Sequence, residues 1–185
     1  MVFKQPSGVK HWNKRYKDLG DSGYGTYDQM KNKLSVIYRN IPQGKIKSII
    51  DYGCGDFVFG LKICELFPKA KYTGIDQSGV IIERNKKFFN PNLFTFKESI
   101  IFEGNADLIV CMDVLFHIDD DKDYYELLNQ IKKASWKYFV VSAFDRFDDQ
   151  GPQMKLRKFN REGWGTLVDE FLLEPEGAYM MVWKK

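Results

Sequence analysis

The residues best suited to chemistry begin at a glycine turn that follows a short apolar run. The segment reads Ile49-Ile50-Asp51-Tyr52-Gly53-Cys54-Gly55-Asp56. Apolar residues that lead into an acid and two closely spaced glycines are typical of a buried parallel strand that turns sharply into a helix. Glycine permits left-handed backbone angles and lets the chain pass close to a ligand. Because open α/β sheets bind ligands at the carboxyl ends of their strands, the segment predicts a nucleotide site.

A second acid, Asp76, follows at a spacing that suits a ribose site. It ends the stretch Lys71–Ile75, which predicts the next strand. Dinucleotide and adenosyl sites place an acid roughly 20 residues beyond the glycine turn, and Asp76 stands close to that distance from Gly55. Since a carboxylate can accept hydrogen bonds from both hydroxyls of a ribose, we expect Asp76 to bind the sugar of a nucleotide.

An acid and an imidazole, Asp113 and His117, follow the apolar run Ala106–Met112. This run predicts a strand buried on both faces, and its end delivers the two side chains to the edge that holds the glycine turn. Such a pair can deprotonate a weak nucleophile such as a hydroxyl. His117 could also be a structural side chain of the turn, and Asp113 could instead bind a cofactor ammonium group or a substrate hydroxyl.

Alternating strands and helices are predicted along the rest of the chain. Helices are expected at about His11–Leu19, Tyr27–Arg39 after a Thr26 cap, Val58–Phe67, Ser78–Phe89, Asp121–Ala134 and Arg161–Glu170. Strands are expected at Ser48–Asp51, Lys71–Asp76, Leu93–Phe96, Ala106–Met112, Tyr138–Ala143, Phe171–Leu173 and Ala178–Trp183. The order predicts an α/β fold, a Rossmann-like three-layer sandwich around a mostly parallel seven-stranded sheet.

The end of the chain distinguishes two candidate cofactors. A Pro/Gly turn at Glu174–Gly177 joins the last two expected strands and predicts a C-terminal antiparallel hairpin. Dinucleotide-binding folds end in parallel strands and carry a third glycine, which is missing here at that spacing. The hairpin, together with Asp51 ahead of Gly53 and Gly55, favours S-adenosylmethionine over a nicotinamide dinucleotide.

Composition bounds the class of protein. A chain of 185 residues with 44% hydrophobic residues predicts one compact globular domain. Its 28 basic residues are interspersed with 25 acidic ones, which disfavours a nucleic-acid partner. Three cysteines without paired spacing and only two histidines argue against a disulfide framework and a zinc site. Without a signal peptide or a membrane-spanning run, we expect a cytoplasmic protein that has no membrane partner.

Several of these motifs resemble the class I S-adenosylmethionine-dependent methyltransferases over nearly the whole chain. Within them the chain resembles small sugar or glycan O-methyltransferases of large viruses and bacteria. The likeness rests on Trp12, Arg15-Tyr16, Ser22-Gly23-Tyr24-Gly25, Asp51–Asp56, Gly74-Ile75-Asp76, Ala106-Asp107-Leu108, Asp113–His117 and Leu156–Phe159. The glycine turn and Asp76 are shared by the whole superfamily, whereas the Ser-Gly-Tyr-Gly loop combined with Asp-Val-Leu-Phe-His is more specific.

The resemblance implies roles for individual residues. Cofactor contacts are implied for Tyr16, Gly23, Tyr24, Gly25, Asp51, Gly53, Cys54, Gly55, Asp76, Gln77, Glu98, Ser99, Met112 and Asp113. Asp113 and His117 would be catalytic, and His117 and Arg157 would contact the acceptor. Residues 1–44 would form a helical cap with a loop that closes over the cofactor, and residues 45–185 the core. No metal is expected, although the acidic run Asp119–Asp121 could bind one instead of starting a helix.

The resemblance also implies a sugar or glycan acceptor, an association with glycosyltransferases and, for a viral source, the host cytoplasm. Two departures from the pattern leave alternatives open. The family usually has glycine where this chain has Phe57, so a bulky side chain could crowd the cofactor and leave a non-catalytic module. The basic segment around Arg157 lacks the usual histidines, so a small metabolite, a protein or a nucleic acid could be the acceptor. The Gly23–Gly25 loop could equally be a plain connector.

Overall fold

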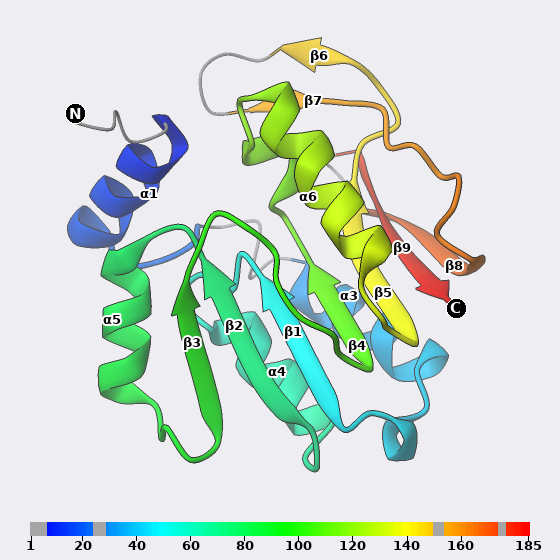
Figure 1. Cartoon of the computed structure of the whole chain (residues 1–185), viewed down its shortest axis with the longest axis horizontal. Helices are drawn as coiled ribbons and strands as arrows, with labels where there is room; N and C mark the ends of the chain where they lie inside the picture. Colours follow the sequence, from blue (N-terminus) through cyan, green and yellow to red (C-terminus); the bar gives the residue numbers. More distant parts are fainter. Residues whose placement is uncertain (1–6, 24–28, 150–153, 174–176) are drawn as a thin grey trace.

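A seven-stranded sheet forms the centre of the protein (Figure 1). The computed structural model describes residues 7–23, 29–149, 154–173 and 177–185. The strands are β1 (Ser48–Tyr52), β2 (Lys71–Asp76), β3 (Phe94–Glu98), β4 (Leu108–Cys111), β5 (Tyr138–Ala143), β8 (Thr166–Leu173) and β9 (Ala178–Lys184). Their order in the sheet is β3-β2-β1-β4-β5-β9-β8, and a separate small ribbon pairs β6 (Asp148–Asp149) with β7 (Lys155–Leu156).

The direction of the strands confirms the predicted fold class. Strands β1 to β5 pair in parallel, whereas β9 runs antiparallel to both β5 and β8. The parallel register aligns the carboxyl ends of β1, β2 and β4, because Asp51 pairs with Gly74 on one side and with Val110 on the other. The glycine turn, Asp76 and Asp113 therefore meet at one edge of the sheet.

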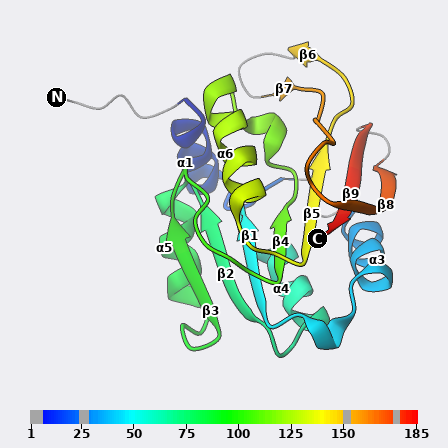
Figure 2. The ribbon, with the colours of Figure 1, turned by 45° about the vertical axis from the view of Figure 1, so that its right-hand side comes forward.

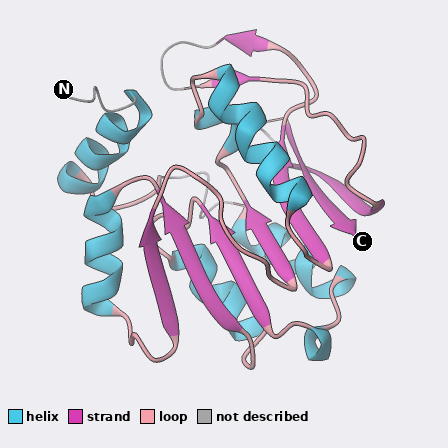
Figure 3. Ribbon diagram, viewed as in Figure 1, coloured by secondary structure: helices cyan, strands magenta, loops and turns pink. Residues whose placement is uncertain are grey.

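Helices cover both faces of the sheet and complete the three layers (Figures 2 and 3). The helices are α1 (Ser7–Asp18), α3 (Met30–Asn40), α4 (Val58–Leu66), α5 (Gly79–Phe88) and α6 (Asp121–Lys133), with short 3₁₀ helices η1 (Gln43–Lys45) and η2 (Leu115–His117). Buried residues of α3, α4 and α5 pack on one face, and those of α6 pack on the other. Among the described residues, no helix combines the length and the apolar character needed to cross a membrane.

The predicted helix over Arg161–Glu170 is wrong. Gly163 and Gly165 have φ angles of +76° and +98°, which end any helix there, and the chain then enters β8 at Thr166. Residues of β8 alternate between exposed and more buried positions, as expected for an edge strand. The buried Trp164 anchors the approach to β8, because its ring stacks on Phe139 with centroids 4.8 Å apart.

Phe57 lies in the core and is absent from the described wall of the cavity reported below. The residue stands at the start of α4 with a left-handed φ of 66°, a conformation that favours glycine. Its ring is fully buried, and the ring centroid lies 4.7 to 5.0 Å from the ring centroids of Tyr72, Phe89, Phe94 and Phe96. The bulky side chain therefore fills an aromatic cluster beneath α4 and does not crowd the site.

Replacing Phe57 by alanine tests this placement. Phe57→Ala should lower the free energy of unfolding by about 3 to 5 kcal/mol, because it leaves a cavity in the aromatic cluster. Phe88→Ala, the same change at a side chain that is 69% exposed, is the control and should cost less than about 1 kcal/mol. Chemical denaturation measures both. Equal losses for the two variants would contradict the buried position.

Candidate active site

A cavity of about 410 Å³ opens at the carboxyl ends of the parallel strands. Its wall joins α1, the glycine turn, the ends of β2 and β4, and η2. Predicted site residues in this wall are Tyr16, Gly23, Asp51, Gly53, Cys54, Asp76, Gln77, Met112, Asp113 and His117. The structure thus brings most of the predicted residues together, although they come from segments far apart in the sequence.

The glycine turn is tightly packed. Gly53 and Gly55 have φ angles of +77° and +51°, and the Gly53 backbone N–H donates to the Ile75 carbonyl at 2.7 Å. A Cβ on Gly53 would lie 2.1 Å from the Val114 side chain, and one on Gly55 would lie 2.2 Å from the Ser22 hydroxyl. Both positions therefore require glycine for conformation and for space. Gly55 itself is not among the cavity-lining residues.

Two buried carboxylates lie beneath the turn. Asp76 accepts hydrogen bonds from the backbone N–H groups of Gly55, at 3.0 Å, and Ser78, at 2.8 Å. Asp51 accepts one from the Tyr72 hydroxyl at 2.6 Å. Burial raises the pKa of Asp76 to about 6 and that of Asp51 to about 7. A ligand that offers hydroxyl or ammonium donors would favour the charged form of either group.

The N-terminal segment closes over the turn through Ser22. The Ser22 backbone N–H donates to Asp56 Oδ2 at 3.0 Å, and the Asp56 N–H donates back to Ser22 Oγ at 3.1 Å. The Tyr16 hydroxyl lies 3.3 Å from the same oxygen. Ser22 begins the Ser-Gly-Tyr-Gly loop that was predicted to close over the cofactor, although it was not singled out as a contact residue. Tyr24 and Gly25, which were predicted to contact the cofactor, lie outside the described residues.

Asp113 occupies a left-handed backbone conformation at the end of β4, with a φ of 59°. Its N–H donates to Ser142 Oγ at 2.6 Å, and that hydroxyl donates to Asp113 Oδ1 at 3.0 Å. The other carboxylate oxygen pairs with the ammonium group of Lys33. Sequence reasoning missed Lys33, because it lies 80 positions away on a helix and resembles an ordinary surface lysine.

His117 lies in η2, on the same wall as Asp113. Its ring packs edge-to-face on Trp12, with centroids 5.1 Å apart, and lies 4.5 Å from the Phe116 ring. These aromatic contacts fix the plane of the imidazole. An adjoining hollow of about 390 Å³ shares Tyr52, Gln77 and His117 with the main cavity and is also lined by Ile100.

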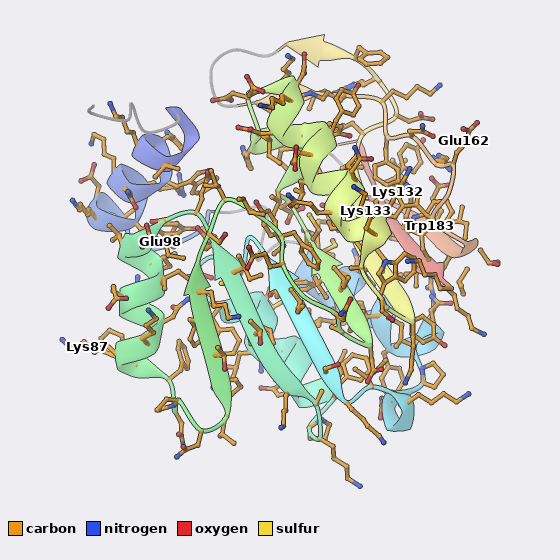
Figure 4. The ribbon with its side chains drawn as sticks, in the orientation of Figure 1. Lys87, Glu98, Lys132, Lys133, Glu162 and Trp183 are labelled. Carbon is orange, nitrogen blue, oxygen red and sulfur yellow. The ribbon has the colours of Figure 1, made fainter. Side chains whose placement is uncertain are left out.

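Glu98 and Ser99 lie at the end of β3, outside the described lining of the main cavity. The Glu98 carboxylate lies beside the start of α5, where a Cβ on Gly79 would meet it at 2.7 Å (Figure 4). Ser99 donates its N–H to the Asp76 carbonyl at 2.9 Å. Ser78 is the N-cap residue of α5, and its hydroxyl donates to Asn13 Oδ1 at 2.6 Å.

Arg157 does not reach the cavity wall, in contrast to the predicted contact with an acceptor. Its buried guanidinium donates to Asp121 Oδ1 and to the Ile118 carbonyl, both at 2.7 Å, and lies 4.7 Å from the Tyr124 ring. These contacts anchor the start of α6. Among the described residues, no group of three His, Cys, Asp or Glu side chains is arranged to hold a metal ion.

Comparison with known proteins finds a matching family model and related sequences. A family model described as "Methyltransferase domain" matches residues 44–170. Ribosomal RNA large subunit methyltransferase G from Shewanella sp. (strain W3-18-1) is 41% identical over 59 residues, which cover 30% of this chain and 16% of that protein. The chain thus matches only a small part of this relative's length.

Solved structures share the fold at low sequence identity. The N-methyltransferase NodS from Bradyrhizobium japonicum WM9, solved with S-adenosylhomocysteine, has a TM-score of 0.69 at 15% identity, and the match covers 97% of this chain and 99% of NodS. The 1,6-didemethyltoxoflavin-N1-methyltransferase from Burkholderia thailandensis was solved with bound 1,6-didemethyltoxoflavin and S-adenosylhomocysteine. It has a TM-score of 0.70 at 16% identity, and the match covers 96% of this chain and 86% of that one.

The buried Asp51 predicts a pH-dependent stability. Burial raises its pKa from 3.8 to about 7, so the folded state binds more protons than the unfolded state between these values. The stability contribution is therefore full below the lower value and is lost as the pH rises through the upper one. Asp51→Asn keeps an acceptor for Tyr72 and cannot ionise. It should melt above the wild type by roughly 3 °C or more near pH 8, and by much less near pH 4.

Thermal melts across this pH range measure the effect, and Asp123→Asn, the same change at an exposed position, controls for net charge. A stability difference that does not depend on pH, or an Asp51→Asn variant that is less stable than the wild type at alkaline pH, would show that the buried carboxylate is not the cause.

Proposed function

The chain belongs to the methyltransferase domain family, as its sequence predicted, and from that premise we propose that it transfers the methyl group of S-adenosylmethionine to a sugar or glycan hydroxyl. One observation carries the proposal: the glycine turn, the buried Asp76 and the Asp113–His117 segment meet in a single cavity. The residues that would bind the methyl donor and the pair Asp113 and His117, which would act on the acceptor, therefore line the same cavity.

The residues of the cavity fit S-adenosylmethionine. The turn residues Gly53 and Cys54, which line the cavity, would offer backbone groups to the methionine end of the cofactor. Asp51 would face its ammonium group, and Asp76 its ribose hydroxyls. Gln77 and Ile100 in the adjoining hollow would lie beside the adenine. When bound, this cofactor supplies a methyl group on a positively charged sulfur.

The chain's own contribution to the reaction is alignment and proton removal. The acceptor oxygen would receive the methyl group, and the sulfur would keep the electron pair of its former bond to that carbon. His117 takes the hydroxyl proton, since a sugar hydroxyl is a poor nucleophile at neutral pH. Both oxygens of Asp113 already accept from Lys33 and Ser142, so Asp113 orients the acceptor and is the weaker candidate for the base.

The cavity wall suits a ring that carries hydroxyls. Trp12, Phe116 and Phe144 contribute aromatic surface to the same cavity as Asp113 and His117. Apolar walls with a few fixed polar groups are typical of small-molecule sites. The faces of a sugar ring can pack on the aromatic rings while its hydroxyls reach the polar pair. An association with a glycosyltransferase, which would make such acceptors, is part of this proposal.

The short match to a ribosomal RNA methyltransferase raises RNA as a second candidate acceptor. The charges near the cavity favour it less, because the basic segment after β6 is neutralised. Lys155 and Arg157 both pair with Asp121, and Lys158 lies 3.7 Å from Asp145. The core position of Phe57 also removes the reason for proposing a non-catalytic module.

Cofactor binding gives the first test. Titration calorimetry with S-adenosylhomocysteine should show one site per chain with micromolar affinity, since the glycine turn and the cavity beside it are already formed. Gly53→Ala should abolish this binding, because the new Cβ meets Val114 and the backbone is left-handed. Gly44→Ala, at a glycine whose Cβ would meet nothing within 4 Å, is the matched control. If the wild-type protein does not bind S-adenosylhomocysteine even at millimolar concentration, the proposal is refuted.

Acceptor chemistry gives the second test. Methyl uptake from labelled S-adenosylmethionine is measured on nucleoside-diphosphate sugars, oligosaccharides, RNA and small aromatic amines, and a sugar should be the best acceptor. His117→Ala should keep cofactor affinity and lose turnover by about 100-fold or more. His11→Ala, the same change at the other histidine, should have a much smaller effect. Preferred methylation of RNA or an amine, or undiminished turnover by His117→Ala, would refute the corresponding assignment.

A further inference from the structure

A buried ion pair joins α3 to the end of β4 in the cavity wall. The Lys33 side chain is only 3% exposed, and its ammonium group pairs with Asp113 Oδ2, whose side chain is 27% exposed. Both residues line the cavity. A buried lysine is costly unless it is paired, because its charge loses the hydration that water provides. The chain therefore holds a compensated pair of charges at this wall and not a lone carboxylate.

The pair stands next to the glycine turn. Val114, the residue after Asp113, packs so closely on the turn that a Cβ on Gly53 would lie 2.1 Å from it. The Asp113 carboxylate is held by Ser142 and Lys33 and faces the cavity from this position. In the proposed function, the methionine end of the cofactor would occupy the same turn, and Lys33 and Asp113 would face it from the wall of the same cavity.

Charge at this wall acts differently on the cofactor and on its product. S-adenosylmethionine carries a positive sulfur, whereas S-adenosylhomocysteine has the same groups with a neutral sulfur. A lone Asp113 carboxylate would attract the positive sulfur of the cofactor, whereas the neutral sulfur of the product would gain no such attraction. It would also hold back the reaction, because the positive charge fades in the transition state and binding that favours the ground state raises the barrier. An adjacent ammonium group offsets both effects.

We propose that Lys33 is a positioning residue that fixes Asp113 and sets the charge beside the reacting sulfur, so that the site does not over-stabilise the charged cofactor relative to the neutral product. The inference rests on the proposed function, since it takes S-adenosylmethionine as the methyl donor. Lys33 acts through Asp113, so changes at the two positions are coupled.

The ratio of two dissociation constants tests the proposal without any acceptor. Calorimetry at low salt gives Kd for S-adenosylhomocysteine divided by Kd for S-adenosylmethionine in each variant. Lys33→Met should raise this ratio roughly tenfold, the size expected for one charge at a partly hydrated wall. Asp113→Asn should lower it by a similar factor, because the variant removes a negative charge from the wall and keeps the positive charge of Lys33. The double variant and Lys33→Arg should return it close to the wild-type value.

Lys31→Met removes the same charge from an exposed position of α3 and should leave the ratio unchanged. A ratio that stays constant in Lys33→Met and Asp113→Asn, while both ligands still bind, would overturn the inference and leave the proposed function intact. A wild-type protein that binds neither ligand would overturn the proposed function itself. If Lys33→Met does not fold, Asp113→Asn decides, and a wild-type ratio in that variant overturns the inference.

Discussion

The close approach of chain segments at the glycine turn is the constraint on which the rest of the site depends. Val114 and Ser22 occupy the space that side chains on Gly53 and Gly55 would fill. The turn can therefore form only where β1 passes sharply into α4 with left-handed glycines. This contact ties the loop after β4 and the N-terminal segment to the turn. The cavity results from that arrangement, since it lies among the three.

The acidic side chains of the cavity differ in how their charge is compensated. Asp51 and Asp76 are buried, and their raised pKa values show that ionisation is costly until donors arrive. Asp113 is different, because Lys33 already compensates it. A ligand with ammonium and hydroxyl groups is thus favoured at the two carboxylates beneath the turn. The wall at Asp113 stays close to neutral, which suits a reaction in which a charge disappears.

Most of the fold could be predicted from the sequence because its central parallel strands, β1, β4 and β5, are largely buried apolar runs. Every residue of β4 is buried, and its apolar run marks it clearly in the sequence. The half-exposed edge strand β8 was predicted largely as a helix, since its mixed apolar and charged residues suit either structure. Only the pairing of β8 with β9 in the folded chain selects the strand. The sequence also gave no sign that Phe57 would occupy a left-handed position and still pack in the core.

Site residues that belong to a local sequence motif could be predicted, whereas those placed by tertiary contacts could not. The glycine turn, Asp76 and Asp113 were found from spacing, whereas the role of Lys33 depends on how the fold brings α3 close to Asp113 after β4. Arg157 was assigned to the acceptor, but its partners are Asp121 and three backbone carbonyls, which only the folded chain brings together.

A crystal structure with S-adenosylhomocysteine is the direct test of whether this cavity is the cofactor site. The methionine end should lie over Gly53 and Cys54, with the ribose at Asp76 and the sulfur on the side of Asp113 and His117. A ligand bound elsewhere, or one whose sulfur faces away from this pair, would refute the assignment of the cavity.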